Sequence, residues 1–278
     1  MCIHGRSPFR FGATLEELRR ETGSEKLGSY VADLSSLAEV RGLAERIISE
    51  HDRLDALVNN AGIISRRREE SGDGHELTFA VNHLSHFLLT GLLLPLLKGS
   101  APARVVNVAS AAQRPIDFAD PMPERGYDAM KAYSQSKLAQ VMFSFELAER
   151  LRDRGVTANA LHPASLMDTK MVRGTFGYTM STVEEGAEAV VRLAASPELE
   201  GVTGRYFDGT REGRANRQAY DSEARQKLWE LSEELCGTSG TIPRTLAEQR
   251  NGAPTGGPCG SARRAPGVES NRRRVADG

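Results

Sequence analysis

The chain has 278 residues and a formal net charge of -1, with 39% hydrophobic and 26% charged residues. A chain of this size and composition can bury one sizeable core and forms one or two domains. Its near-zero net charge argues against nucleic acid or a charged membrane surface as a partner. The three cysteines, Cys2, Cys236 and Cys259, are far apart and match no metal-binding spacing, so we expect no metal site and a reducing, cytoplasmic location.

Apolar periodicity predicts alternating helices and strands along residues 1–236. The expected helices are 14–22, 37–48, about 75–97, the helix that contains Tyr133 and stops at Gly155, a helix capped by Ser181 or Thr182 that ends before Pro197, and 221–235. The expected strands are 29–33, 54–59, 104–110, 156–161 and 205–207, and loops are expected at 65–74, 111–132 and 170–180. This alternation predicts an α/β fold whose parallel sheet is covered on both faces. Residues 237–278 are rich in Gly, Pro and Arg and lose the periodicity, so we predict a disordered tail after the domain 1–236.

The most apolar run of the chain, residues 84–97, is interrupted by polar residues, by Gly91 and by Pro95. Its 14 residues fall short of the roughly 20 that are needed to span a bilayer. We therefore expect a buried helix and no transmembrane segment.

Tyr133 and Lys137 are four residues apart in a predicted helix, which places them on the same face. A phenol is a poor acid or base at neutral pH, and a nearby positive charge favours its phenolate form. We expect Lys137 to lower the pKa of Tyr133 and make it useful for proton transfer. A solvated pair on a helix surface is the alternative interpretation of this spacing.

Polar groups also follow the predicted strands at their carboxyl ends, where parallel sheets place functional groups. Asn59-Asn60-Ala61-Gly62 ends one strand, Ser110 ends the next, and His162-Pro163-Ala164 ends a third. Ser110 taken alone could be a cap or turn residue. We interpret His83, His86 and His162 as packing or hydrogen-bonding residues. No GxSxG elbow surrounds Ser110, which argues against a serine hydrolase.

These motifs occur in the order and spacing of the short-chain dehydrogenase/reductase family, which the chain resembles over residues 1–235. The resemblance rests on NNAG, on Ser110 ending VVNVAS, on YSQSK, and on the Pro-led loop that ends in Asp168-Thr169. The segments AYSQSKLAQVMF and LHP resemble the branch of retinol-dehydrogenase-like enzymes and their bacterial relatives. The resemblance implies a doubly wound, Rossmann-like parallel sheet. The family's glycine-rich TGxxxGxG turn does not occur ahead of Arg6, so we expect a sheet truncated at its first βα unit.

The resemblance implies an oxidoreductase that transfers a hydride between NADP(H) and a carbonyl or secondary alcohol. Tyr133 would be the general acid/base, and Lys137 would support it and hold the nicotinamide ribose. Ser110 would hydrogen-bond the substrate oxygen, and Asn82 would support a water relay to the lysine. From the residues alone, Asn82 could equally be a polar residue on a helix edge.

The family resemblance also implies which residues of this chain contact the cofactor. Arg6 matches the end of the family's second strand, where a basic residue suits the 2′-phosphate and favours NADP over NAD. Asp33 matches the residue beside adenine. The remaining positions that the resemblance assigns to the cofactor are Leu34, Asn60, Ala61, Gly62, Tyr133, Lys137, Pro163 and Thr169.

Partner and substrate follow less directly from the sequence. We expect a small, hydrophobic carbonyl or alcohol substrate, and a homo-oligomer that pairs through the apolar helix 75–97 and the Tyr133 helix. The alternative is a catalytically silent relative kept for binding or assembly, because the pyrophosphate-binding turn is missing.

Overall fold

The computed structural model describes residues 1–238. The predicted disordered tail, 237–278, therefore lies outside the described residues except for Gly237 and Thr238.

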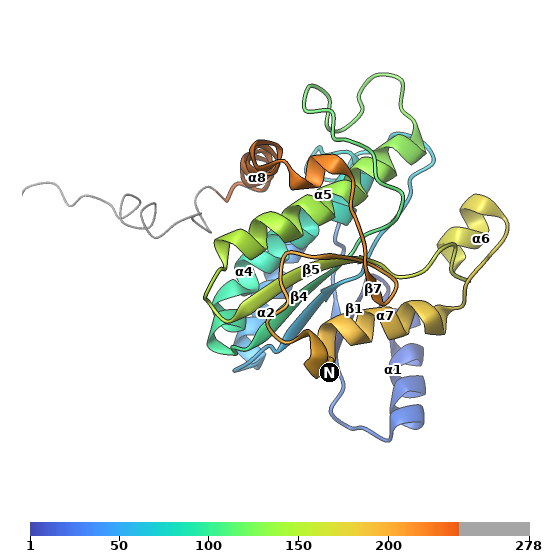
Figure 1. The fold of residues 1–278 in the computed structure, drawn as a ribbon. Coiled ribbons are helices and arrows are strands. Elements are labelled where there is room, and N and C mark those ends of the chain that lie inside the picture. Colours follow the sequence, from blue (N-terminus) through green and yellow to red (C-terminus); the bar gives the residue numbers. More distant parts are fainter. Residues whose placement is uncertain (239–278) are drawn as a thin grey trace, which may run out of the picture. The chain divides into compact units, whose positions relative to one another are not determined.

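Seven strands form two groups in the structure, and all but the last pair are parallel. The strands are β1 (Cys2–Gly5), β2 (Gly28–Val31), β3 (Ala56–Asn59), β4 (Ala103–Val108), β5 (Val156–His162), β6 (Tyr206–Asp208) and β7 (Arg211–Glu212). β1 pairs with β2, and the second sheet has the order β3-β4-β5-β6-β7 (Figure 1). The predicted α/β class with a parallel sheet is confirmed.

The helices lie between the strands, as the alternation predicted. They are α1 (Pro8–Thr22), α2 (Leu37–Glu50), α3 (Leu77–Phe79), a π-helical turn η1 (Ala80–Leu84), α4 (Ser85–Gly99), α5 (Ala129–Arg150), α6 (Lys170–Phe176), α7 (Val183–Ala195), the 3-10 turns η2 (Pro197–Leu199) and η3 (Arg217–Tyr220), and α8 (Ser222–Cys236).

Side-chain caps explain where several helices begin. The Ser36 side chain accepts a hydrogen bond from the Glu39 N–H at the start of α2. Thr182 and Glu185 form a reciprocal capping box at the start of α7, which confirms the predicted cap.

Two predicted boundaries were wrong. The first helix begins at Pro8 rather than residue 14, because proline is tolerated in the first helical turn, where its missing N–H is not needed. Residues 170–176 were predicted to be a loop and form α6 instead. Thr169 caps this helix, and Gly177 ends it in the left-handed conformation at φ 77°.

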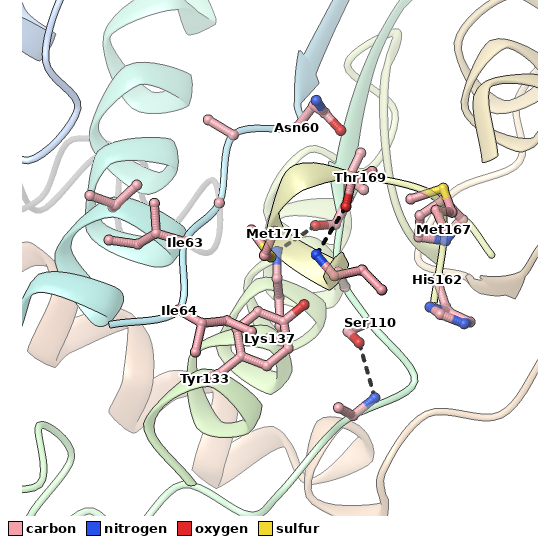
Figure 2. A pocket seen from close by; sticks show the side chains of 18 of the residues that line it. Asn60, Ile63, Ile64, Ser110, Tyr133, Lys137, His162, Met167, Thr169 and Met171 are labelled. Atoms are coloured by element: carbon pink, nitrogen blue, oxygen red, sulfur yellow. Dashed lines mark hydrogen bonds between the residues drawn. The ribbon is translucent and has the colours of Figure 1, made fainter. Parts of the chain in front are cut away.

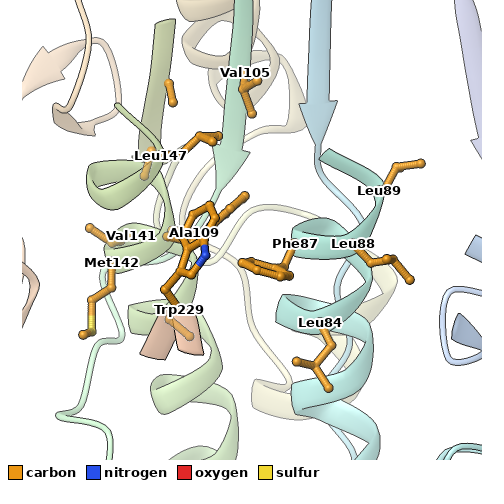
Figure 3. Close-up of a cluster of buried hydrophobic side chains, with 14 of the residues drawn as sticks. Leu84, Phe87, Leu88, Leu89, Val105, Ala109, Val141, Met142, Leu147 and Trp229 are labelled. Atoms are coloured by element: carbon orange, nitrogen blue, oxygen red, sulfur yellow. The ribbon is translucent and has the colours of Figure 1, made fainter. Parts of the chain in front are cut away.

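The core lies between β3, β4 and β5 and the helices α4 and α5, with α2 packed beside α4 and α7 on the opposite face (Figure 1). α8 then covers α5. Phe87 of α4, Phe143 of α5 and Trp229 of α8 meet with ring centroids 4.9 to 5.9 Å apart. Figure 3 shows Phe87 and Trp229 facing each other in this core. The apolar surface that we expected to pair with a second copy is therefore occupied by the chain's own last described helix.

The apolar helix is longer than its sequence run suggested. The continuous helical segment Leu77–Gly99 has 23 residues and is apolar enough to cross a membrane by length and composition. However, 78% of that apolar window is buried inside the protein. The burial confirms the expectation of a buried helix, while the argument from its short length was wrong.

The sheet is interrupted between β1 and β3. Neither strand pairs with the other, so each offers a free edge among the described strands. Val58, in the middle of β3, keeps 37% of its surface exposed, whereas strands of a parallel sheet are normally buried on both faces. The truncation predicted from the missing glycine-rich turn thus coincides with a gap in strand pairing.

Candidate active site

A cavity of about 620 Å³ opens beyond the carboxyl ends of the strands. It collects residues from β1, from the loops after β2, β3, β4 and β5, and from α5. Figure 2 shows Asn60 after β3, Ser110 after β4 and Tyr133 on α5 around it. Every predicted site residue except Asn82 lines it: Arg6, Asp33, Leu34, Asn60, Ala61, Gly62, Ser110, Tyr133, Lys137, Pro163 and Thr169. This is the position in which open α/β sheets bind their ligands.

Tyr133 and Lys137 rise side by side from α5 into this cavity (Figure 2). The Lys137 Nζ atom lies 5.7 Å from the centroid of the Tyr133 ring. The same atom donates hydrogen bonds to the Val108 carbonyl at 2.9 Å and to Gln140 Oε1 at 2.8 Å. The predicted pairing on one helix face is present.

The pKa values of this pair run against our expectation. Burial raises the pKa of Tyr133 above its ordinary value, although the nearby Ser110 hydroxyl acts in the opposite direction. Burial lowers the pKa of Lys137 from 10.5 to about 7. The expected lowering of the phenol pKa was wrong for this structure, because enclosure disfavours the charged form of both groups. A phenol that keeps its proton at neutral pH suits the role of a general acid.

Ser110 is held at the end of β4 by contacts to its backbone. Its carbonyl oxygen accepts hydrogen bonds from Gln113 Nε2 at 2.8 Å and from the Tyr206 hydroxyl at 3.2 Å. Its hydroxyl accepts one from the Ala112 N–H at 3.1 Å and retains its own hydrogen for another partner.

Asn82 lies in the π-helical turn before α4, and its side chain faces the loop after β3 rather than the cavity. Its amide accepts from the Ile63 N–H at 2.8 Å and donates to the Ile63 carbonyl at 3.0 Å. It also donates to Ser136 Oγ on α5 at 2.9 Å. Irregular π turns are frequent at functional sites. Here the turn lets one buried amide fix the NNAG loop against α5.

Gly62 leaves little room for a side chain. A Cβ atom there would lie 3.3 Å from Lys137 Nζ and 3.4 Å from Asn82 Oδ1. The glycine of NNAG therefore lets the loop approach both polar groups closely.

Two oppositely charged residues also line the cavity. Arg6 follows β1, and Asp33 follows β2. Asp33 accepts hydrogen bonds from the Ser35 N–H and hydroxyl at 2.9 and 2.8 Å. Burial alone would raise the pKa of Asp33, but these bonds and the nearby Arg6 outweigh it and keep the pKa below its ordinary value. Asp33 is thus an anion held in place beside a cation.

Hydrophobic periodicity carried no signal for the residues that form most of the apolar wall. Ile64, Met130, Met167, Met171 and Val172 line the cavity, and they come from segments that were predicted to be loops or loop margins. Because such segments carry no hydrophobic periodicity, only the fold brings these residues together.

The three predicted packing histidines fit that interpretation in part. His83 and His86 are buried, and burial lowers the pKa of each to about 3. His162 lines the cavity, hydrogen-bonds Ser165 Oγ at 3.1 Å, and has a pKa lowered by burial.

The residues fit a nicotinamide dinucleotide at both of its ends. Lys137 can donate to ribose hydroxyls, and Arg6, which lines the same cavity, can bind an anion. Between β1 and β3, no described segment supplies the helix N-terminus that commonly binds a pyrophosphate.

Comparison with known proteins agrees with this geometry. The family model of the short chain dehydrogenases matches residues 1–177. The chain belongs to the short-chain dehydrogenase/reductase family and is an oxidoreductase of its retinol-dehydrogenase-like branch.

Among its relatives, human retinol dehydrogenase 14 is 41% identical over 234 residues, which cover 78% of this chain and 70% of that protein. An uncharacterized protein from Mycobacterium paratuberculosis has a similar structure, with a TM-score of 0.64 and 28% identity over 85% of this chain and 84% of that one. Pseudomonas aeruginosa RhlG, solved as an active-site complex with NADP, superposes with a TM-score of 0.57 at 28% identity, over 74% of this chain and 83% of that one. The predicted family and fold class are confirmed.

Proposed function

We propose that this protein transfers a hydride between NADP(H) and an apolar alcohol or carbonyl compound, with Tyr133 as the proton donor and acceptor. The observation that carries the proposal is the joint placement of Tyr133, Lys137 and Ser110 around one cavity. When bound, NADPH supplies the hydride to the carbonyl carbon.

The chain's own residues would handle the proton and the oxygen. Tyr133, whose pKa is raised by burial, would give its proton to the carbonyl oxygen as negative charge develops there. The Ser110 hydroxyl would donate a hydrogen bond to the same oxygen. Lys137 would donate to the nicotinamide ribose. A water relay from Asn82 to the lysine is part of the proposal, because Asn82 fixes the loop next to Lys137.

The cofactor is proposed to be NADP rather than NAD. Arg6 lies at the end of β1, in the same cavity as the catalytic pair, and its guanidinium suits a phosphate. The structural relative from Pseudomonas aeruginosa was solved with NADP. NAD lacks the 2′-phosphate, and it would leave Arg6 without this partner.

The substrate is proposed to be apolar because Ile64, Met130, Met167 and Met171 form the wall beside Tyr133. Two relatives, human retinol dehydrogenases 14 and 13, are named for retinol, so all-trans-retinal is a suitable first probe. A cytoplasmic location is also part of the proposal, because a reducing compartment keeps thiols such as those of Cys2 and Cys236 free.

The interrupted sheet favours a second proposal, in which the protein is a catalytically inactive family member that binds partners without turnover. One experiment separates the two. NADPH oxidation with retinal is followed at cofactor concentrations into the millimolar range, because the missing turn predicts weak binding.

The proposal predicts turnover by the parent chain and its loss in Tyr133→Phe, which removes one hydroxyl and no apolar volume. Tyr178→Phe, at a tyrosine that is 59% exposed, is the matched control and should keep the parent's rate. Equal rates in Tyr133→Phe and the parent would contradict the assignment, and the absence of turnover in every variant would favour the silent relative.

A further inference from the structure

The ammonium group of Lys137 is held by the protein on two sides. It donates to the Val108 carbonyl at the end of β4 and to Gln140 Oε1, which lies one turn further along α5. An ammonium has three hydrogens and no acceptor. Because Lys137 also lines the cavity, its third hydrogen is left for whatever binds there. The two protein contacts therefore set the direction of the third.

Gln140 is itself fixed by a residue from a different helix. Its side chain is fully buried, and its Nε2 atom lies 2.9 Å from His86 Nδ1 of α4. Since Gln140 gives its carbonyl oxygen to the ammonium, it must give its N–H to His86. This assigns the imidazole proton to Nε2 and leaves Nδ1 as an acceptor.

His86 can accept the hydrogen bond from Gln140 because its ring is neutral. The same burial leaves its other ring nitrogen without a hydrogen-bond partner among the described residues. Burial keeps its pKa at about 3, so Nδ1 holds a lone pair at every physiological pH. Its Nε2 atom, however, is buried with no hydrogen-bond partner within residues 1–238. An apolar residue would avoid this unpaired donor. The acceptor that the ring offers to Gln140 accounts for an imidazole at this place.

We propose that His86 and Gln140 are positioning residues that orient the Lys137 ammonium toward the cavity through a line of hydrogen bonds from α4 to α5. The inference rests on the proposed function of Lys137 and adds two residues outside the YxxxK motif. Lys137 faces two titratable groups, Tyr133 on its own helix and His86 on α4. β4 offers the Val108 carbonyl, and the loop after β3 offers Gly62. Gln140 is thus the neutral side chain that accepts from the Lys137 ammonium, and it can be replaced by mutation to test the contact.

The first test measures the lysine directly. The chain has six lysines, so the lysine 13Cε signals of labelled protein can be titrated by NMR and Lys137 identified by its loss in Lys137→Met. Gln140→Met removes the acceptor and should lower the midpoint of Lys137 by about one pH unit, because hydrogen bonds to the charged form favour it. Gln140→Glu places a carboxylate there and should raise the midpoint by at least as much.

The matched control is Gln135→Met, which removes another buried amide of α5. Gln135 Oε1 accepts from the Asp117 N–H at 2.9 Å and makes no hydrogen bond with Lys137. This variant should leave the Lys137 midpoint unchanged. Shifts of the same sign in Gln140→Met and Gln140→Glu, or no shift in either, would overturn the proposal.

A pair of variants tests the α4 end of the line. His86→Asn can present an amide oxygen in place of Nδ1 and should preserve the Lys137 midpoint. His86→Leu has no acceptor and should move the midpoint in the same direction as Gln140→Met, by a smaller amount. If Gln140→Met does not fold, Gln140→Glu and this pair decide the matter. Equal midpoints in His86→Leu and the parent would remove His86 from the line.

Cofactor titrations distinguish this inference from the proposed function. NADPH affinity measured by fluorescence should fall at alkaline pH, and the fall should begin about one pH unit earlier in Gln140→Met than in the parent. A parent that never turns over would sink the proposed reaction and leave the lysine titration standing. A parent that turns over, with Lys137 midpoints unaffected by Gln140, would sink only the line of hydrogen bonds.

Discussion

At the scale of single residues, Gly62 shows how closely the loop after β3 approaches Lys137. We predict that Gly62→Ala lowers turnover by about tenfold or more, because a Cβ 3.3 Å from Lys137 Nζ forces that ammonium to move. Steady-state rates at saturating substrate measure the loss. Gly42→Ala in α2 is the control, since a Cβ there meets nothing within 4 Å. It should leave the rate unchanged and raise the free energy of unfolding by about 0.5 to 1 kcal/mol.

The buried lysine also makes stability depend on pH. Its pKa is about 7 in the folded protein against 10.5 as the reference value, so the unfolded chain binds more protons between these two values. The free energy of unfolding must therefore rise with pH across that window, while below it the folded protein bears the full cost of the buried charge. We predict that the parent gains about 2 kcal/mol from pH 7 to pH 9 relative to Lys137→Met. Urea denaturation of both proteins at the two pH values measures it, and parallel curves would contradict the low pKa.

At the scale of elements, the sequence predicted the strands and long helices because their apolar periodicity is strong and their caps are local. Strand ends in the sequence placed Asn60, Ser110 and Pro163 at the cavity, while Arg6 and Asp33 were placed there by the family resemblance. It missed α6, whose seven residues KMVRGTF carry too short a pattern to distinguish a helix from a loop. It missed the π turn around Asn82, because a one-residue irregularity leaves no periodicity. The contacts around Lys137 were also missed, because the Val108 carbonyl comes from β4 and the His86 ring that holds Gln140 comes from α4.

α8, which is distant in sequence, packs on apolar side chains of α4 and α5. Trp229 is 2% exposed and lies against Phe87 and Phe143, and the Arg150 guanidinium lies 4.0 Å from its ring centroid. We predict that Trp229→Ala lowers the free energy of unfolding by about 3 to 5 kcal/mol. Urea denaturation followed by circular dichroism measures it, because Trp229 is the chain's single tryptophan. Trp229→Phe keeps most of the ring contacts and should cost much less, and an equal cost would argue against packing as the cause.

At the scale of the whole molecule, the free strand edges offer a second surface for the expected homo-oligomer. α8 covers the faces of α4 and α5, whereas the free edges of β1 and β3 present unpaired backbone groups that can pair with another chain. We predict that the 278-residue chain associates in a concentration-dependent way, and that a βα unit supplied ahead of Met1 suppresses this association. Sedimentation velocity at micromolar concentrations compares the two proteins. Equal masses would point to pairing through another surface.

The same gap in the sheet predicts weak cofactor binding by this chain. A strand in the gap followed by a glycine-rich turn and a helix would pair both edges and direct backbone N–H groups at the pyrophosphate. We therefore expect a protein extended upstream by about 30 to 40 residues, one βα unit, to bind NADPH and turn over, while the 278-residue chain binds poorly. Fluorescence titration of NADPH against both proteins tests this. Micromolar binding by the shorter chain would show that Arg6, Asp33 and Lys137 hold the cofactor without a pyrophosphate turn.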